Sequence, residues 1–404
     1  MIEVELAFLT VASIMVIGFV GNALFRRTGF PEIPFLLLLG IILGPVLKIF
    51  PIDALLPITP YLTYLALIMV LFNGGIEMHI VEIFSKGDRA LLLGILYFFL
   101  CTFSATVIAK LFLGMDWVEG FMLGSLVAGT CPVVIIPLVS KLSLGRDIVI
   151  TLSLESVITD LLVVVFFSTF LEAHITGMVG LEEALSTIVG KFSIGTFLGF
   201  FAGVVWLRLL YSTREEEYEY IATIAIVIAC YMLAKSLGGS ELLSVFIFGL
   251  VLGNDKHIVK FLKLGIDLSA LKETQAYLKR FQEELSFLIR SFFFVLLGAL
   301  YQTSESSPIL WFFWGAVFTG IDLATRYIAV FISTKGSPLA SYRPFLTLMC
   351  GHGTAQAALS LIPLQYGMPN ARIYMASILN LIILTNLITA FSARVKGRKE
   401  KPAV

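Results

Sequence analysis

Runs of about twenty apolar residues recur along the whole chain, and they restrict its fold more than any other feature. A helix needs about 20 apolar residues to cross the hydrocarbon core of a bilayer. The chain is 58% hydrophobic and only 14% charged, whereas soluble domains carry about 25% charged residues. There are too few charges to cover a surface that faces water. We therefore expect an all-α polytopic membrane protein.

Thirteen candidate spans result when the apolar runs are read between charged residues and Gly or Pro breaks. Their approximate limits are 5–24, 31–49, 58–76, 90–113, 117–140, 148–171, 190–211, 219–236, 240–253, 285–302, 308–333, 342–365 and 371–393. The ninth is short, and Gly74-Gly75 is expected to interrupt the third. Residues 254–284 are expected to form a connecting loop with an amphipathic helix on the membrane surface. The sequence predicts a single transmembrane domain over residues 1–404, which ends in a basic tail at 394–404.

Lys and Arg are distributed unevenly between the predicted connections. When alternate connections lie on opposite sides, 22 basic residues fall on one side and 5 on the other, and Arg290 within a span completes the 28. Such an excess marks the cytoplasmic side. We expect a multi-pass protein of the cell membrane, in contact with membrane lipids, with an external N-terminus and a cytoplasmic C-terminus. The formal net charge of zero argues against a nucleic-acid partner.

The apolar runs contain an internal repeat. "PEIPFLLLLGIILGP" at 31–45 and "SELLSVFIFGLVLGN" at 240–254 share a Glu, an apolar block and a Gly-x-x-x-Gly pattern. A Gly-Thr pair recurs in "SLVAGTCPVV" and "LMCGHGTAQAA". The matching spans are seven apart, so the two copies would cross the membrane in opposite directions, as in the inverted repeats of secondary transporters. Repeat 1 covers about 5–171 and repeat 2 about 219–393, with a linking helix at about 190–211.

Two spans are expected to be broken at membrane depth. Pro132 follows "GTC" in the fifth span and lacks the N–H that a helix interior needs. Gly351 and Gly353 interrupt the twelfth span. Irregular backbone at this depth is tolerated only where it is buried in protein or lines a wet cavity. Each break alone could be a packing kink, but their equivalent positions in the two repeats favour crossing helices that form a site near the midplane.

Asp160 is the residue that fits least well in its span, "SLESVITDLLVVVFF". A carboxylate at the centre of a bilayer costs about 2.5–3.5 kcal/mol on insertion scales. Ser156 lies four residues earlier, on the same helix face, and Thr159 adjoins the carboxylate. A carboxylate with neighbouring hydroxyl and carbonyl oxygens suits a hard monovalent cation. The sequence has no His/Cys cluster for a transition metal, no phosphate loop and no nucleophile with a general base, so we expect neither an enzyme nor a cofactor.

These motifs, in this order and spacing, resemble those of the cation/proton antiporter superfamily, and most closely its NhaP branch of sodium/proton antiporters. The resemblance covers essentially the whole chain. It rests on "LLLGIILGP", "FNGG", "GTCP", "ESVITD", "TRYIAV" and the Gly-rich break of the twelfth span. It implies exchange of Na⁺ or Li⁺ for H⁺, with these transported ions in place of any cofactor. It also implies a homodimer.

The resemblance further assigns roles to individual residues. Asp160 matches the family aspartate that binds the cation and the proton in alternation, and Ser156 and Thr130 match its accompanying Na⁺ ligands. Glu155 matches a glutamate that the family pairs with an arginine of the twelfth span, where this chain has His352. Other candidate site residues and departures from the family pattern are Thr159 for Asn or Asp, Cys131 for the Asp of "TDP", Asn73 for the acidic residue of "FEGG", and Thr354 at the second break.

A single shared carboxylate predicts one-for-one, electroneutral exchange, because sodium and a proton compete for one negative charge. Several alternatives stay open. The chain could exchange K⁺ for H⁺, or it could be a transport-inactive sensor of the same fold. His352 could sense pH or be satisfied locally. Arg290 is expected to pair with Glu155 or Asp322, or with Asp160 in a purely structural ion pair. Asp322 and Arg326, four residues apart, are expected to form an intrahelical pair.

Overall fold

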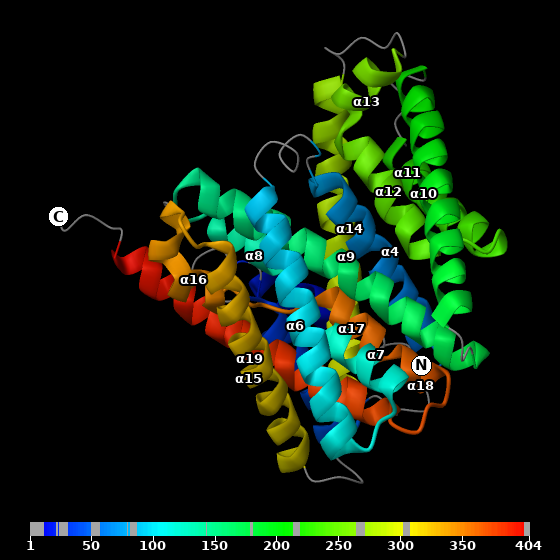
Figure 1. Ribbon diagram of the computed structural model, residues 1–404. Coiled ribbons are helices and arrows are strands. Elements are labelled where there is room, and N and C mark those ends of the chain that lie inside the picture. The colour runs from blue at the N-terminus through cyan, green and yellow to red at the C-terminus, as the bar shows by residue number, and fades with distance from the viewer. Residues whose placement is uncertain are drawn as a thin grey trace. The chain divides into compact units, whose positions relative to one another are not determined.

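The computed structural model describes residues 12–21, 23, 31–49, 57–78, 80, 87–142, 144–177, 181–212, 219–263, 271–301 and 308–399. Within these ranges the chain is helical and contains no β-strand (Figure 1). Eight of the described helices are long and apolar enough to cross a membrane, and a bent helix pair makes nine if it counts as one span. The expected all-α polytopic fold is therefore confirmed, whereas the count of thirteen spans stays a prediction.

The helices form two compact units. The first comprises Met1–Tyr64, Lys86–Phe170 and Leu288–Val404, and the second comprises Leu65–Ser85 and Leu171–Phe287. The prediction of a single domain with two repeats concerns the order of spans along the chain, and it stays a prediction.

The first unit contains most of the helices that carry polar side chains at membrane depth. α6 packs against α7 and α15, α15 packs against α19, and α17 packs against both α7 and α19 (Figure 1). The elements of this unit are α2 (Ile33–Ile41), η1 (Ile42–Val46), α6 (Asp88–Leu113), α7 (Trp117–Val127), α8 (Pro132–Val139), α9 (Arg146–Thr176), α15 (Pro308–Ser333), η2 (Pro338–Tyr342), α16 (Arg343–Leu348), α17 (Thr354–Ser360), α18 (Ile362–Gln365) and α19 (Ala371–Lys399). The end of α9 belongs to the second unit, whereas residues 288–299 at the end of α14 (Leu271–Ala299) belong to the first.

The second unit is built around α10 (Leu181–Ser212), which packs against α11 (Glu219–Ser236) and α12 (Glu241–Gly253). It also contains most of α4 (Thr59–Glu77). The expected interruption at Gly74-Gly75 is wrong, because α4 runs through both glycines. A Cβ atom on Gly75 would lie 2.2 Å from the carbonyl oxygen of Phe246 in α12. This glycine therefore allows two helices to touch and does not break one.

In the described part of 254–284, the structure has more helix than the expected connecting loop with one amphipathic helix. α12 is followed by α13 (Asp255–Leu262) at a bend of 83°, and α14 (Leu271–Ala299) runs unbroken past the predicted start of the tenth span at 285. Residues 271–297 contain neither Gly nor Pro, so nothing in the sequence stops this helix between its polar and its apolar halves.

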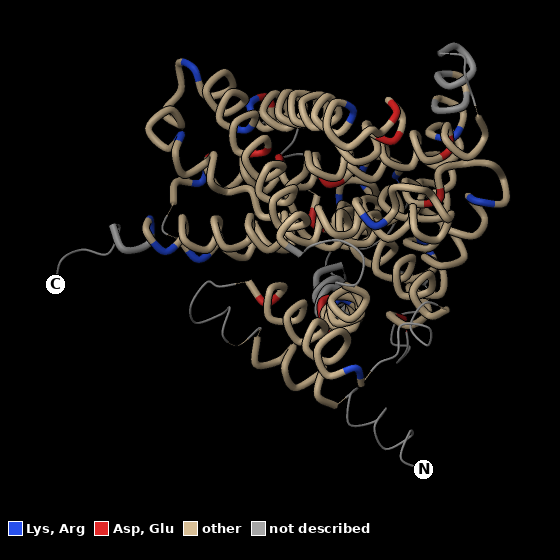
Figure 2. Tube along the Cα trace, turned by 90° about the horizontal axis from the view of Figure 1, so that it is seen from below, with Lys and Arg blue, Asp and Glu red and all other residues tan. Residues whose placement is uncertain are grey.

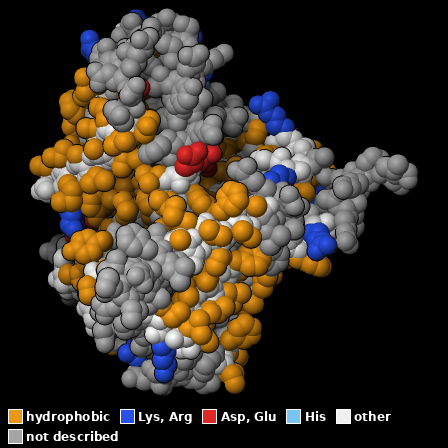
Figure 3. All heavy atoms as spheres, turned by 180° about the vertical axis from the view of Figure 1, so that it is seen from behind, with side chains coloured by type: hydrophobic (Ala, Val, Ile, Leu, Met, Phe, Trp, Pro, Cys, Tyr) orange, Lys and Arg blue, Asp and Glu red, His pale blue; other side chains and the backbone are white. Residues whose placement is uncertain are grey.

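Charged residues are sparse along the described helices (Figure 2), and large apolar side chains are exposed instead. Phe197 and Phe201 of α10 and Leu233 of α11 are each more than half exposed, and hydrophobic side chains cover much of the face in Figure 3. Apolar surface of this extent indicates contact with lipid or with protein. It agrees with a multi-pass membrane protein.

Candidate ion-binding site

The two spans expected to break are both broken, and their breaks are joined directly in the first unit. α7 ends at Val127 and α8 begins at Pro132, while α16 ends at Leu348 and α17 begins at Thr354. The backbone N–H of Cys131 donates to the carbonyl oxygen of Gly351 at 2.8 Å. A Cβ atom on Gly353 would lie 2.2 Å from the Cys131 Sγ, so only glycine permits this crossing.

Polar side chains of α19 form hydrogen bonds with the backbone groups that are left free at the second break. The Asn386 Nδ2 donates to the carbonyl oxygen of His352 at 2.8 Å. The hydroxyls of Thr385 and Thr389 accept from the N–H groups of His352 and Cys350 at 3.3 and 3.2 Å. Backbone that has left the helix at membrane depth thus finds partners inside the protein, as it must.

Asp160 lies on α9 beside this crossing, with 5% of its surface exposed. The Gln356 Nε2 donates to its Oδ1 at 3.1 Å, and the Gln356 Oε1 accepts from the N–H of Gly353 at 3.1 Å. Because the amide oxygen is held by the break, the amide NH₂ is directed at the carboxylate. Gln356 was not among the residues predicted from sequence, although it is the only amide side chain in "GHGTAQAA".

Three other predicted site residues contact one another at the first break: Thr130 in the break itself, and Glu155 and Thr159 of α9. The Thr130 Oγ1 lies 3.1 Å from the Glu155 Oε1, to which it donates, and 3.0 Å from the Thr159 Oγ1. Thr159 also donates to the backbone carbonyl of Glu155 at 3.0 Å. Ser156 is buried on the same helix, and its hydroxyl donates to the carbonyl of Ser153 at 2.9 Å. These hydroxyls keep oxygen lone pairs that a cation can use.

Two further predicted residues, Thr354 and Asn73, differ in their surroundings. Thr354 is buried at the start of α17, and its Oγ1 has no hydrogen-bond partner among the described residues. Asn73 belongs to the second unit, where its Nδ2 donates to the Ser286 Oγ at 2.6 Å.

Glu155 forms a buried ion pair with Arg326 of α15. The two Nη atoms donate to the two carboxylate oxygens at 2.8 and 2.9 Å, and the Nε donates to the carbonyl of Leu346 at 3.1 Å. Both side chains are fully buried. The expected intrahelical pair with Asp322 is therefore wrong. A planar guanidinium can meet both carboxylate oxygens at once, which makes such bidentate pairs the stronger ones.

Arg290 pairs with Glu32, not with Asp160, Glu155 or Asp322 as expected. Its Nη2 lies 2.6 Å from the Glu32 Oε1. Glu32 directly precedes α2 and was not among the partners predicted from sequence.

His352 contacts backbone rather than Glu155. Its two ring nitrogens each lie 2.9 Å from a carbonyl oxygen, that of Cys350 and that of Val127. A neutral imidazole has one N–H and so can donate to only one of these two carbonyls.

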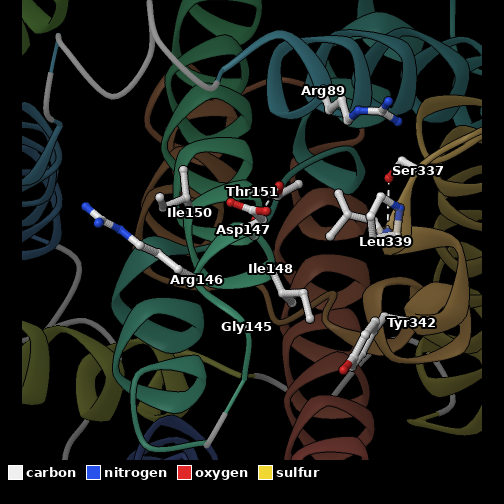
Figure 4. A pocket seen from close by; sticks show the side chains of 11 residues that line it. Arg89, Gly145, Arg146, Asp147, Ile148, Ile150, Thr151, Ser337, Leu339 and Tyr342 are labelled. Carbon is white, nitrogen blue, oxygen red and sulfur yellow. Dashed lines mark hydrogen bonds between the residues drawn. The ribbon is translucent and has the colours of Figure 1, made fainter.

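A pocket opens at the start of α9 and is distinct from these residues. Arg89, Asp147, Leu339 and Tyr342 are among the side chains that line it (Figure 4). Asp160 lies thirteen residues further along α9, which is about 20 Å at 1.5 Å per residue.

Crossed broken helices with a buried carboxylate beside them are the architecture of a secondary transporter. Comparison with known proteins agrees. The family described as "Sodium/hydrogen exchanger, transmembrane" matches residues 11–395, and the chain belongs to this family.

Individual relatives carry related descriptions. The chain is 29% identical to the "Probable Na(+)/H(+) antiporter 2" of Methanocaldococcus jannaschii over 83% of this chain and 79% of that protein. It is 24% identical to the "K(+)/H(+) antiporter NhaP2" of Shewanella sp. (strain ANA-3), over 85% of this chain and 58% of that protein. The solved structure of the sodium proton antiporter MjNhaP1 from Methanocaldococcus jannaschii at pH 8 has the same fold, with a TM-score of 0.80 and 23% identity over 98% of this chain and 99% of that one.

The buried pair predicts that Arg326→Met destabilises the protein by about 3–5 kcal/mol, because Glu155 is left charged and unpaired. Thermal unfolding in detergent measures this loss. The matched control is the double variant Glu155→Gln with Arg326→Met, which removes both charges and should recover much of the loss. Equal destabilisation by the single and the double variant would contradict the ion pair.

Proposed function

We propose that this chain exchanges Na⁺ or Li⁺ for H⁺ across the cell membrane by alternating access, and that Asp160 is the site for which the two ions compete. The observation that carries the proposal is the buried Asp160 carboxylate beside two crossed breaks, where Gln356 is its one hydrogen-bond donor in the described part of the chain. Membership of the sodium/hydrogen exchanger family supports Na⁺ and H⁺ as the transported ions.

Exchange follows from the charge of this one group. Without a bound ion, Asp160 carries a negative charge inside the protein, and an unpaired buried charge is strongly unfavourable. Either a sodium ion or a proton neutralises it. The protein therefore changes its accessible side only when one of the two is bound. Gln356 favours the charged form between these events, because its NH₂ group donates to the carboxylate.

The sodium ligands in this proposal are the Asp160 carboxylate and the hydroxyl oxygens of Ser156 and Thr130. Sodium is a hard cation and prefers oxygen donors. The hydroxyl of Thr354 is a further donor of this kind, since it has no partner among the described residues. Thr159 holds the Thr130 backbone, since its Oγ1 accepts from the N–H of Thr130 at 3.2 Å. The role of Asn73 rests on the family resemblance alone.

One-for-one, electroneutral exchange is part of the proposal. The second buried carboxylate of α9, Glu155, is already neutralised by Arg326 at 2.8 Å. Thr159 has no charge to add. Among the buried acidic residues described on α9, Asp160 alone is then free to take an ion, so one cation replaces one proton.

The similarity to K⁺/H⁺ antiporters of Shewanella favours K⁺ as the alternative cation. The membrane orientation, with the C-terminus cytoplasmic, is proposed from the distribution of basic residues. A homodimer is proposed from the family resemblance.

Asp160→Asn should abolish exchange, because an amide can neither bind a proton at this position nor neutralise a cation. The measurement is recovery of a quenched pH gradient in everted vesicles when Na⁺, Li⁺ and K⁺ are added in turn. Asp147→Asn, at the exposed start of the same helix, is the matched control and should transport normally.

Each outcome of that assay bears on the assignment. Exchange that survives Asp160→Asn would remove Asp160 from the mechanism. A wild-type response to K⁺ alone would support the alternative cation, and no response to any cation would support a sensor.

Electroneutral exchange predicts that an imposed membrane voltage leaves the initial rate unchanged. Proteoliposomes containing the wild-type chain, with a potassium diffusion potential of either sign and fixed Na⁺ and pH gradients, provide the measurement. A rate that follows the sign of the voltage would rule out one-for-one exchange.

A further inference from the structure

Asp322 is a further buried acidic side chain, and the proposed exchange does not use it. It is fully buried on α15. Its Oδ1 accepts a hydrogen bond from the Tyr97 hydroxyl, and its Oδ2 has no hydrogen-bond partner among the described residues. Buried polar atoms are nearly always hydrogen-bonded, and a buried carboxylate is normally paired with a cation or accepts several bonds. Asp322 in its charged form meets neither condition.

The nearest cation does not neutralise it. Arg326 follows Asp322 by four residues on α15, so the two share a helix face. Its guanidinium, however, is already engaged by both oxygens of Glu155 and by the carbonyl of Leu346. One face of the guanidinium lies over the Tyr97 ring, at 4.9 Å from its centre.

The side chains around Asp322 leave one negative charge in excess. The titratable groups that face it come from four elements: Tyr97 and Cys101 of α6, Glu155 of α9, Arg326 of α15, and Cys350 at the break before α17. Of these described groups, Arg326 is the one cation. His352 faces Arg326 and Glu155 from the same break, but its ring nitrogens are directed at backbone carbonyls.

We propose that Asp322 is a proton-binding site, in which the carboxyl group is held as a neutral acid. The proton resides on Oδ2, the oxygen that lacks a partner, while Oδ1 accepts from Tyr97. The cluster of Glu155, Arg326 and Asp322 is then electrically neutral, as a group fully removed from water must nearly be.

This proton also determines the partner of Arg326. A charged Asp322 would compete with Glu155 for the guanidinium from one helical turn away. Glu155 accepts the hydroxyl of Thr130 at the first break, so a change of partner would disturb the crossing. A bound proton at Asp322 thus holds Arg326 on Glu155, and its loss at alkaline pH would weaken the crossing and lower transport.

Infrared spectroscopy of the full-length protein tests the proton directly. The carbonyl band of a buried carboxylic acid should be present in wild type at neutral pH, persist when Na⁺ is added, and be missing from Asp322→Asn. The same band in Asp322→Asn and wild type would overturn the proposal. If Asp322→Asn does not fold, Tyr97→Phe serves instead: it removes the donor to Oδ1 and should shift that band, and an unshifted band would overturn the assignment.

A transport assay of the same variant is a second test of the proposal, and it rests on the proposed exchange. Asp322→Asn mimics the neutral acid but cannot lose a proton, so it should exchange ions at neutral pH and keep its activity at alkaline pH where wild type declines. A folded Asp322→Asn protein without exchange at neutral pH would show that the charged form is required, which contradicts the proposal. The infrared result does not depend on transport, so failure of the Asp160 mechanism would leave it intact.

Discussion

The backbone hydrogen bond between the two broken helices is the contact on which the rest of the first unit depends. Where Cys131 donates to Gly351, both chains have left their helices at a depth where lipid supplies no partner. α19 satisfies the second break through Asn386, Thr385 and Thr389. Gly353 allows the two chains to approach, because any Cβ atom would overlap Cys131. The crossing in turn orients Gln356 toward Asp160.

Charge balance then distinguishes the acidic groups near the crossing. Glu155 is fully buried and paired on both oxygens with Arg326, so its charge is already neutralised, and it accepts the Thr130 hydroxyl at the first break. Asp160 has an amide donor in place of a cation. The two buried carboxylates of α9 therefore differ in their capacity to take an ion. This difference underlies the proposed assignment of exchange to Asp160 alone.

The sequence was sufficient to predict the all-α fold, the two breaks and the buried position of Asp160, because each depends on local features: apolar length, Pro132, Gly351 and a charge within an apolar run. Partners of charged groups were not predictable. Arg326 lies 171 positions from Glu155 along the chain, and Arg290 pairs with Glu32 across 258 positions. Gly75 was misread for the same reason, since a glycine that breaks a helix and one that admits a neighbouring helix look alike in sequence.

The most direct test of the account is whether sodium and protons compete for one site. Initial rates of sodium-driven exchange in proteoliposomes would be measured over a range of Na⁺ concentrations at several pH values. A single shared carboxylate predicts that the apparent KM for Na⁺ rises in proportion to proton concentration on the acid side while the maximal rate stays constant. An apparent KM that does not change with pH would contradict the account, because the two ions would then bind at different groups.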